Sequence, residues 1–202
     1  MTRYRWQMWV LVAVGYAAGI AGVFRIPGEV PPVQSLLIAL LLPSGAAVIY
    51  VSTTTILAKD SSNTSSSVLV KTYARILFGV ILFIVALQVL AVAVLAGAVP
   101  PGSWLARAPI VLFGLLAIWI GNLLPRTRPN LALGIRTRRT LWDRQAWIST
   151  HRIAGYLAVF LGCLFVVSGI FFSKQHIETI LGPVSIAAAF LLAAQYLRSR
   201  TV

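Results

Sequence analysis

Residues 120–152 read IGNLLPRTRPNLALGIRTRRTLWDRQAWISTHR, a long stretch that is polar, irregular and rich in arginine. It holds seven of the seventeen basic residues and separates two strongly apolar runs. Apolar runs long enough to cross a hydrocarbon layer predict membrane helices, and the polar stretch between them is then a connecting loop. The stretch therefore predicts an all-α membrane fold and marks where the chemistry of this chain is concentrated.

The composition of the whole chain supports the same fold class. Hydrophobic residues make up 59% of its 202 residues and charged residues only 10%. A soluble domain has about a quarter of its residues charged. We therefore expect a polytopic helical bundle in a membrane, with no room for an additional soluble domain.

Six transmembrane helices are predicted from apolar windows of about 17–25 residues that exclude charges. The windows cover residues 8–24, 35–57, 76–99, 108–124, 153–172 and 179–197. A polar, serine-rich segment interrupts them, so we expect a two-helix hairpin over 1–58, a linker over 59–71 and a four-helix membrane domain over 72–202.

Three features inside the spans predict how the helices pack. Pro43 frees a backbone carbonyl in the second span, which a neighbouring helix is expected to satisfy. Gln88 in the third span is expected to bridge two helices. Small residues recur every four or seven positions in the fifth span and allow another helix to approach closely, by default within the same molecule; they are Ala154, Gly155, Ala158, Gly162 and Gly169.

The distribution of cations predicts the orientation. With six spans, one side of the membrane carries fourteen Lys and Arg residues and the other only three, namely Arg25, Arg107 and Lys174. By the positive-inside rule, both termini are then cytoplasmic. The net charge of +13 is explained by the same arrangement, because cationic residues beside the membrane attract anionic headgroups. We accordingly expect the lipid bilayer as a partner and no nucleic acid.

Candidate catalytic groups are scarce. The four acidic residues all lie outside the predicted spans, which argues against the carboxylate relay of a proton-coupled pump. His151 and His176 flank opposite ends of the fifth span, and no cluster has metal-ligand spacing. We expect no enzymatic activity, no metal and no cofactor.

The loop itself offers individual candidates. Asn122 precedes the helix-ending Pro125 and is placed to bond the last carbonyls of the fourth span. Gly134 permits a backbone turn that other residues avoid, and Arg136 follows it directly. Further on, Arg144, Trp147 and His151 share one face of a helix that enters the fifth span. Taken singly, they are expected to be interfacial anchors at headgroup depth; the functional interpretation makes His151 and Arg136 parts of a pocket.

Together these residues resemble the SdpI family of bacterial membrane proteins. The resemblance rests on IGNLLP at 120–125, PN at 129–130, GIRT at 134–137, TL at 140–141, and Trp147 with THRIAG at 150–155. Carried over to this chain, the motif and candidate binding residues are Asn122, Pro125, Asn130, Gly134, Arg136, Thr137, Trp147, His151 and Arg152.

The resemblance implies a function by binding. The type member of the family is an immunity protein against a secreted, membrane-active peptide toxin, and it also recruits a cytoplasmic repressor. We therefore expect a multi-pass protein of the bacterial cytoplasmic membrane whose partners are a peptide toxin and such a repressor. Two alternatives stay open: a small-solute transporter or channel, for which Gln88 and Ser168 are the polar candidates, and an enzyme acting on a lipid phosphate through Arg136, Arg138 and His151.

Overall fold

The structure, a computed structural model, describes residues 2–25, 31–59, 67–100, 103–130 and 133–172. Throughout these ranges the ordered elements are helices, and the five long ones are α1 (Thr2–Val23), α2 (Pro32–Lys59), α3 (Ser67–Leu95), α4 (Ala108–Leu123) and α6 (Arg144–Phe171). Shorter elements are η1 (Trp104–Arg107), η2 (Leu124–Arg126) and α5 (Arg138–Trp142). Each long helix is apolar and long enough to cross a membrane, α4 together with its flanking turns, which confirms the polytopic helical bundle. The sixth predicted span, 179–197, lies outside the described residues.

The helices extend beyond the apolar windows that predicted them. Lys71 and Arg75 belong to the first turns of α3, and α6 begins at Arg144, well before residue 153. A window stops at the first charge, whereas a helix continues until its backbone groups meet a cap. For α6 that cap is Asp143, whose carboxylate accepts a hydrogen bond from the Gln145 N–H at 2.7 Å.

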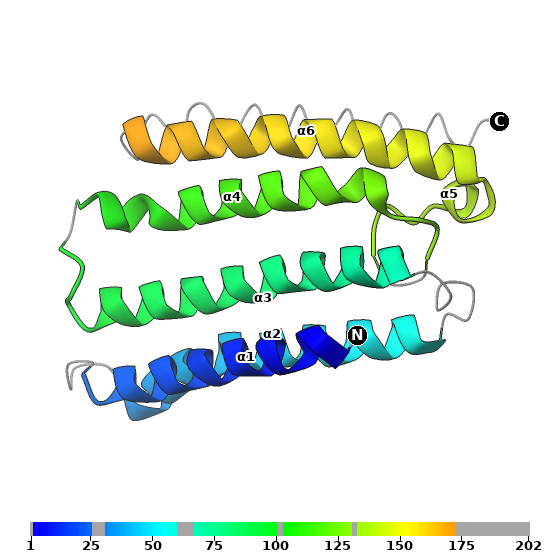
Figure 1. Cartoon of the computed structure of the whole chain (residues 1–202). Coiled ribbons are helices and arrows are strands. Elements are labelled where there is room, and N and C mark those ends of the chain that lie inside the picture. Colours follow the sequence, from blue (N-terminus) through cyan, green and yellow to red (C-terminus); the bar gives the residue numbers. More distant parts are fainter. Residues whose placement is uncertain (1, 26–30, 60–66, 101–102, 131–132, 173–202) are drawn as a thin grey trace.

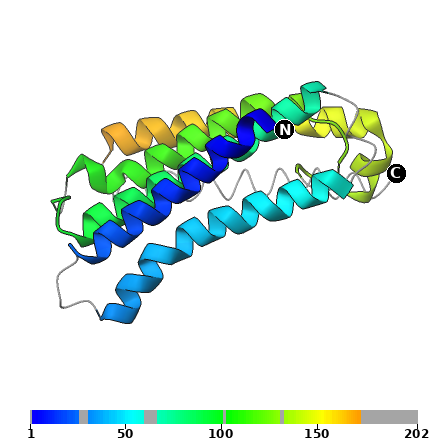
Figure 2. The ribbon, with the colours of Figure 1, turned by 60° about the horizontal axis from the view of Figure 1, so that its bottom comes forward.

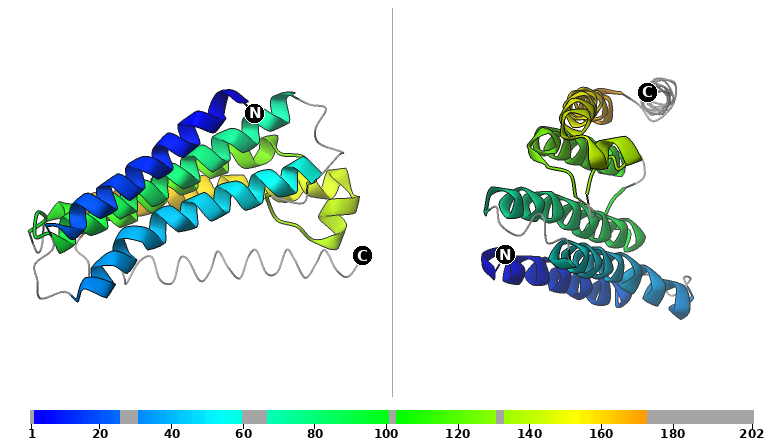
Figure 3. Two further views of the ribbon diagram at one scale, coloured as in Figure 1. Left: turned by 90° about the horizontal axis from the view of Figure 1, so that it is seen from below. Right: turned by 90° about the vertical axis from the view of Figure 1, so that its right-hand side faces the viewer.

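The long helices run roughly parallel to one another in layers (Figure 1). Seen along the bundle, α6, α4 and α3 lie one above the other, with α1 and α2 together on the far side of α3 (Figure 3). The end of α2, the start of α3, α5 and the connection between α4 and α6 all lie at one end of the bundle (Figure 1). That arginine-rich end therefore carries the residues of 120–152; which compartment it faces stays a prediction.

The main buried cluster joins α1, α2 and α3. Met8 and Val12 of α1 pack with Ala46 and Tyr50 of α2 and with Ile81 of α3. Ala46 and Ile81 are completely buried. Burial among helices in lipid stabilises through close packing more than through a hydrophobic gain, so shape complementarity decides which faces meet.

A proline and a glutamine join α2 to α3. Pro43 lies inside α2, which changes direction along its length (Figure 2). A proline has no N–H, so the carbonyl four residues earlier, that of Ala39, loses its helical partner. Gln88 of α3 replaces it: the Gln88 Nε2 group donates to the Ala39 carbonyl oxygen at 3.2 Å. Both expectations for these residues, a neighbour for the freed carbonyl and a bridge between helices, are confirmed.

Glycines bring α4 and α6 into backbone contact. A Cβ atom built on Gly114 would lie 2.6 Å from the Gly162 carbonyl oxygen, and one on Gly121 would lie 2.8 Å from that of Gly155. The two pairs are each seven residues apart and run in opposite directions, as antiparallel helices require. The prediction that the small residues of the fifth span serve packing within the molecule is confirmed for Gly155 and Gly162.

Candidate functional site

The connection between α4 and α6 folds back against the end of the bundle rather than extending from it (Figure 1). Its ordered parts are η2, residues 127–130, residues 133–137 and α5. We call residues 124–143, as far as they are described, the inner loop, because they fold inward against the bundle. Almost every polar group buried in it bonds to the loop itself or to the first turns of α6.

Two aromatic rings at the start of α6 form the floor of the inner loop. Trp147 and His151 are stacked, with ring centroids 3.9 Å apart and an interplanar angle of 15°. Both side chains are fully buried, at 0% exposure. The indole N–H of Trp147 donates to the Thr127 carbonyl oxygen at 3.2 Å. The expectation that Trp147 and His151 are interfacial anchors is therefore wrong, because the inner loop covers them. Arg144, which was predicted to share their helix face, is exposed.

His151 holds the loop through one ring nitrogen, while the other ring nitrogen is bonded within α6. The Ile135 N–H points at the His151 Nε2 atom, 3.1 Å away, so this nitrogen must accept. The hydrogen of a neutral ring is then on Nδ1, which lies 2.9 Å from the Trp147 carbonyl oxygen and donates to it. A doubly protonated ring has no acceptor lone pair, so the geometry requires neutral imidazole. His151 thus acts as a clamp between α6 and the backbone of the inner loop.

Position 134 requires a glycine beside His151 for two reasons. Its φ angle is +109°, a backbone conformation that residues with a side chain rarely adopt. A Cβ atom there would collide with the His151 Nε2 atom and lie 3.1 Å from the Trp147 ring. The absence of a side chain therefore lets the loop backbone lie directly on the two rings.

Asn130 organises the preceding turn. Its Nδ2 group donates to the carbonyl oxygens of Arg128 at 2.8 Å and Leu133 at 2.9 Å, and its Oδ1 atom accepts from the Leu133 N–H at 2.7 Å. The side chain is 2% exposed. A side-chain amide that bonds nearby backbone groups in this way substitutes for regular secondary structure. Asn130 is therefore a structural centre of the loop.

Thr137 and Thr140 build the short helix α5. The Thr137 Oγ1 atom accepts from the Thr140 N–H at 3.1 Å, and the Thr140 Oγ1 atom accepts from the Thr137 N–H at 2.8 Å. This reciprocal capping box uses a threonine where glutamate or glutamine is usual. The Thr140 hydroxyl also donates to the Ile135 carbonyl oxygen at 2.9 Å, which links α5 to the residue clamped by His151.

Three residues that matter here were not assigned a role from the sequence. Thr127 receives the Trp147 indole, and Thr140 joins α5 to Ile135. Tyr73 of α3 donates from its hydroxyl to the Arg128 carbonyl oxygen at 3.2 Å, while Leu133 packs on the cluster of Leu57 and Tyr73. The spacing of Thr137 and Thr140 carried a capping signal, whereas Thr127 and Tyr73 are recognisable only once the chain is folded.

The remaining motif residues separate into packed and exposed ones. Pro125 packs against Gly155 of α6, where a Cβ atom would lie 3.1 Å from the proline ring. Asn122, in contrast, is exposed between the buried Gly121 and Leu123, so it lies outside the cluster. Arg136 and Arg152 are exposed as well. Arg136 follows Ile135, so its backbone is positioned by the His151 clamp although its side chain reaches the surface.

Arginines cover the outside of the inner loop and the start of α6. Seven are exposed, and we call them the arginine surface: Arg126, Arg128, Arg136, Arg138, Arg139, Arg144 and Arg152. Asp143 is the one acidic residue among those described, and its carboxylate caps α6. Such an excess of positive charge produces a field that attracts anionic groups.

Within the described ranges, no group of three His, Cys, Asp or Glu side chains is placed to hold a metal.

Comparison with known proteins connects this site to a family. Residues 126–195 match the family model described as the SdpI/YfhL protein family. The match includes the inner loop from Arg126 onward, α5 and α6, and it supports the assignment of the chain to the SdpI family. Asn122 and Pro125 precede the matched segment. Neither the curated proteins nor the solved structures contain a significant match to the chain.

Proposed function

We propose that this membrane protein of the SdpI type protects its cell against a membrane-active peptide toxin by binding the toxin, and that its arginine surface docks a cytoplasmic regulator. One observation carries the proposal: the buried polar side chains of the inner loop are used to hold the loop, while seven arginines are presented outside it. A rigid support with an exposed charged face is what a binding protein needs.

The hydrogen bonds of His151 support binding over catalysis. A general acid or base must exchange a proton with its substrate and therefore needs a ring nitrogen within reach of it. Both nitrogens of His151 face backbone groups, and the ring is fully buried. The alternative of a lipid-phosphate enzyme built on Arg136, Arg138 and His151 loses its acid–base candidate, although its two arginines remain exposed.

The transport alternative rests on polar groups within the spans. Transporters bind their substrates near the middle of the membrane, at polar or irregular backbone. Gln88 and Ser168 are both buried. Ser168, however, lies near the end of α6, and the Gln88 amide group already bonds the Ala39 carbonyl. That bond stabilises a bent helix, which favours a structural role for the one buried amide in the described spans.

The test is the membrane potential of sensitive bacteria that express this protein. Cells are challenged with an SDP-type toxin peptide and, separately, with an unrelated pore-forming peptide. We expect wild type to preserve the potential against the first peptide and to lose it against the second. His151→Ala at matched membrane abundance is expected to lose protection, because the inner loop is released.

A charge variant separates the two parts of the proposal. Arg138→Glu combined with Arg139→Glu changes two exposed side chains of α5 outside the buried clamp, so protection is expected to persist while recruitment of the cytoplasmic regulator is lost. If wild type fails to protect against the SDP-type peptide at full membrane abundance, immunity to that toxin is wrong for this protein.

A further inference from the structure

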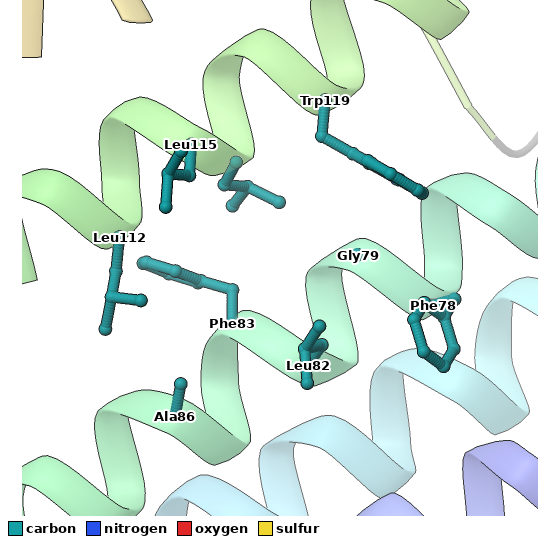
Figure 4. Close-up of a pocket in the computed structure, with 9 residues that line it drawn as sticks. Phe78, Gly79, Leu82, Phe83, Ala86, Leu112, Leu115 and Trp119 are labelled. Carbon is teal, nitrogen blue, oxygen red and sulfur yellow. The ribbon is translucent and has the colours of Figure 1, made fainter. Parts of the chain in front are cut away.

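A groove between α3 and α4 is a feature of the surface that the proposed function does not use. It encloses about 220 Å³ and opens to the side of the bundle. Gly79, Leu82 and Phe83 of α3 face Leu112, Leu115 and Trp119 of α4 across it (Figure 4). Its lining is almost wholly hydrocarbon, so within a membrane span its natural contents are apolar.

The lining and the opening of the groove indicate its class of ligand. A groove of about 220 Å³ that opens to the side of the bundle and is lined almost wholly by hydrocarbon is accessible to the acyl chains of the surrounding bilayer. An acyl chain from the surrounding bilayer fits this space without a change in the helices.

The cations beyond one end of the groove indicate which lipid would be held. Lys71 and Arg75 are exposed and precede Gly79 by eight and four residues, so all three share one face of α3. At 1.5 Å per residue they lie about 12 Å and about 6 Å beyond Gly79, toward the arginine-rich end. On α4, the exposed Asn122 lies one turn past Trp119 on the same side of the groove.

Trp119 marks the boundary between the two halves of such a site. Its ring reaches from α4 toward Gly79 (Figure 4), and its indole N–H donates to the Arg75 carbonyl oxygen at 3.0 Å. Tryptophan prefers the depth at which hydrocarbon meets headgroups. The apolar lining therefore lies on the hydrocarbon side of Trp119, and Lys71, Arg75 and Asn122 lie on the headgroup side.

We infer that the α3–α4 groove is a binding site for one anionic phospholipid, with an acyl chain in the groove and its phosphate beside Arg75, Lys71 and Asn122. This gives the exposed Asn122 a role that the inner loop does not. The inference depends on the membrane location of the chain and is independent of toxin resistance.

The test uses the full-length protein in nanodiscs of equal parts phosphatidylglycerol and phosphatidylcholine. Trace amounts of either lipid carry a photoactivatable group on the acyl chain, and adducts are located by peptide mass spectrometry. We expect adducts on residues 78–86 and 112–119, with phosphatidylglycerol labelling these residues about fivefold or more above phosphatidylcholine.

Variants examine the two halves of the site separately. Arg75→Ala and Lys71→Ala are each expected to lower the preference for phosphatidylglycerol by about fivefold at most, since a cation near the surface contributes about that factor. Arg152→Ala is the matched control, because it removes an exposed arginine of the same end on a different helix. Ala86→Phe fills the groove and is expected to abolish the adducts while leaving the cations in place.

Three results would overturn the inference. The first is equal labelling by both lipids, which would mean that the cations select no headgroup. The second is an unchanged preference in Arg75→Ala and Lys71→Ala when both retain wild-type abundance and helicity. The third concerns a photoreactive residue placed at position 115: if it captures a toxin peptide or residues 173–202 of this chain instead of a lipid, the groove has another occupant.

Discussion

Gln88 of α3 donates a hydrogen bond to the carbonyl oxygen of Ala39, the carbonyl that Pro43 deprives of its partner within α2. The bend of α2 at Pro43 and the hydrogen bond from Gln88 therefore form one structural unit. Gly19 of α1 packs against the same carbonyl, so three helices meet at this point. The other amide atom of the glutamine, Oε1, is buried without a hydrogen-bond partner among the described residues.

A double-mutant cycle tests this unit. Gln88→Leu is expected to lower the free energy of unfolding by about 1 kcal/mol, since it leaves the Ala39 carbonyl unpaired. In a Pro43→Ala background, residue 43 supplies its own N–H to that carbonyl, so the same substitution is expected to cost close to nothing. Steric-trapping measurements in bicelles give the four values. Additive effects would contradict the coupling.

Gly134 is expected to tolerate no side chain. Gly134→Ala places a methyl group against His151 at a positive φ angle, which costs about 1–3 kcal/mol through backbone strain alone. We expect lower membrane abundance and a red shift of Trp147 fluorescence, measured with the other five tryptophans replaced. Gly45→Ala is the control, because open space surrounds that position within α2. Equal behaviour of the two variants would refute the role of Gly134.

His151→Phe separates stacking from hydrogen bonding. A phenyl ring preserves the stack on Trp147 but accepts no hydrogen bond, so the Ile135 N–H loses its partner at a cost of about 1–3 kcal/mol. Because trypsin cleaves backbone that opens locally, cleavage after Arg136, Arg138 or Arg139 is expected to accelerate. Peptide mapping of treated membrane vesicles measures the rate. Wild-type cleavage rates in His151→Phe would show that the stack alone holds the loop.

The glycine contacts between α4 and α6 are expected to limit side-chain size at single positions. Gly162→Val forces the helices apart, because a Cβ atom there already lies 2.6 Å from the Gly114 carbonyl oxygen. Overpacking of this kind costs about 1–3 kcal/mol. Cys163→Val is the control. It introduces the same valine at a neighbouring position that is exposed, so it is expected to leave the stability unchanged. Thermal aggregation of the purified protein compares them.

The arginine surface is expected to bind acidic partners in a salt-dependent manner. Pull-down of the cytoplasmic regulator by membrane vesicles is expected to fall as ionic strength rises, because the seven arginines are exposed and screened by salt. Arg138→Glu with Arg139→Glu is expected to abolish the pull-down, whereas Arg25→Glu at the opposite end of the bundle leaves it unchanged. Retention by the double variant would move the docking site elsewhere.

Sequence alone determined the fold class and the location of the chemistry. Apolar length predicts a membrane helix because a hydrocarbon layer requires every backbone group to be bonded within the segment, and the described residues contain five such helices. The arginine-rich loop and the packing role of the spaced glycines were also predicted from the sequence. Each of these features depends on residues that are close along the chain or that share one helix face.

Only the tertiary structure decided what the motif residues do. Trp147 and His151 look like interfacial residues along the chain, yet the folded loop buries them. Asn122 looks like a helix cap, yet it is exposed in the last turn of α4. These outcomes depend on contacts such as Ile135 with His151, Tyr73 with Arg128 and Gln88 with Ala39, which join distant segments. The neighbouring residues in the sequence indicate which environment a side chain prefers. Its actual burial depends on which distant segment packs over it in the folded chain.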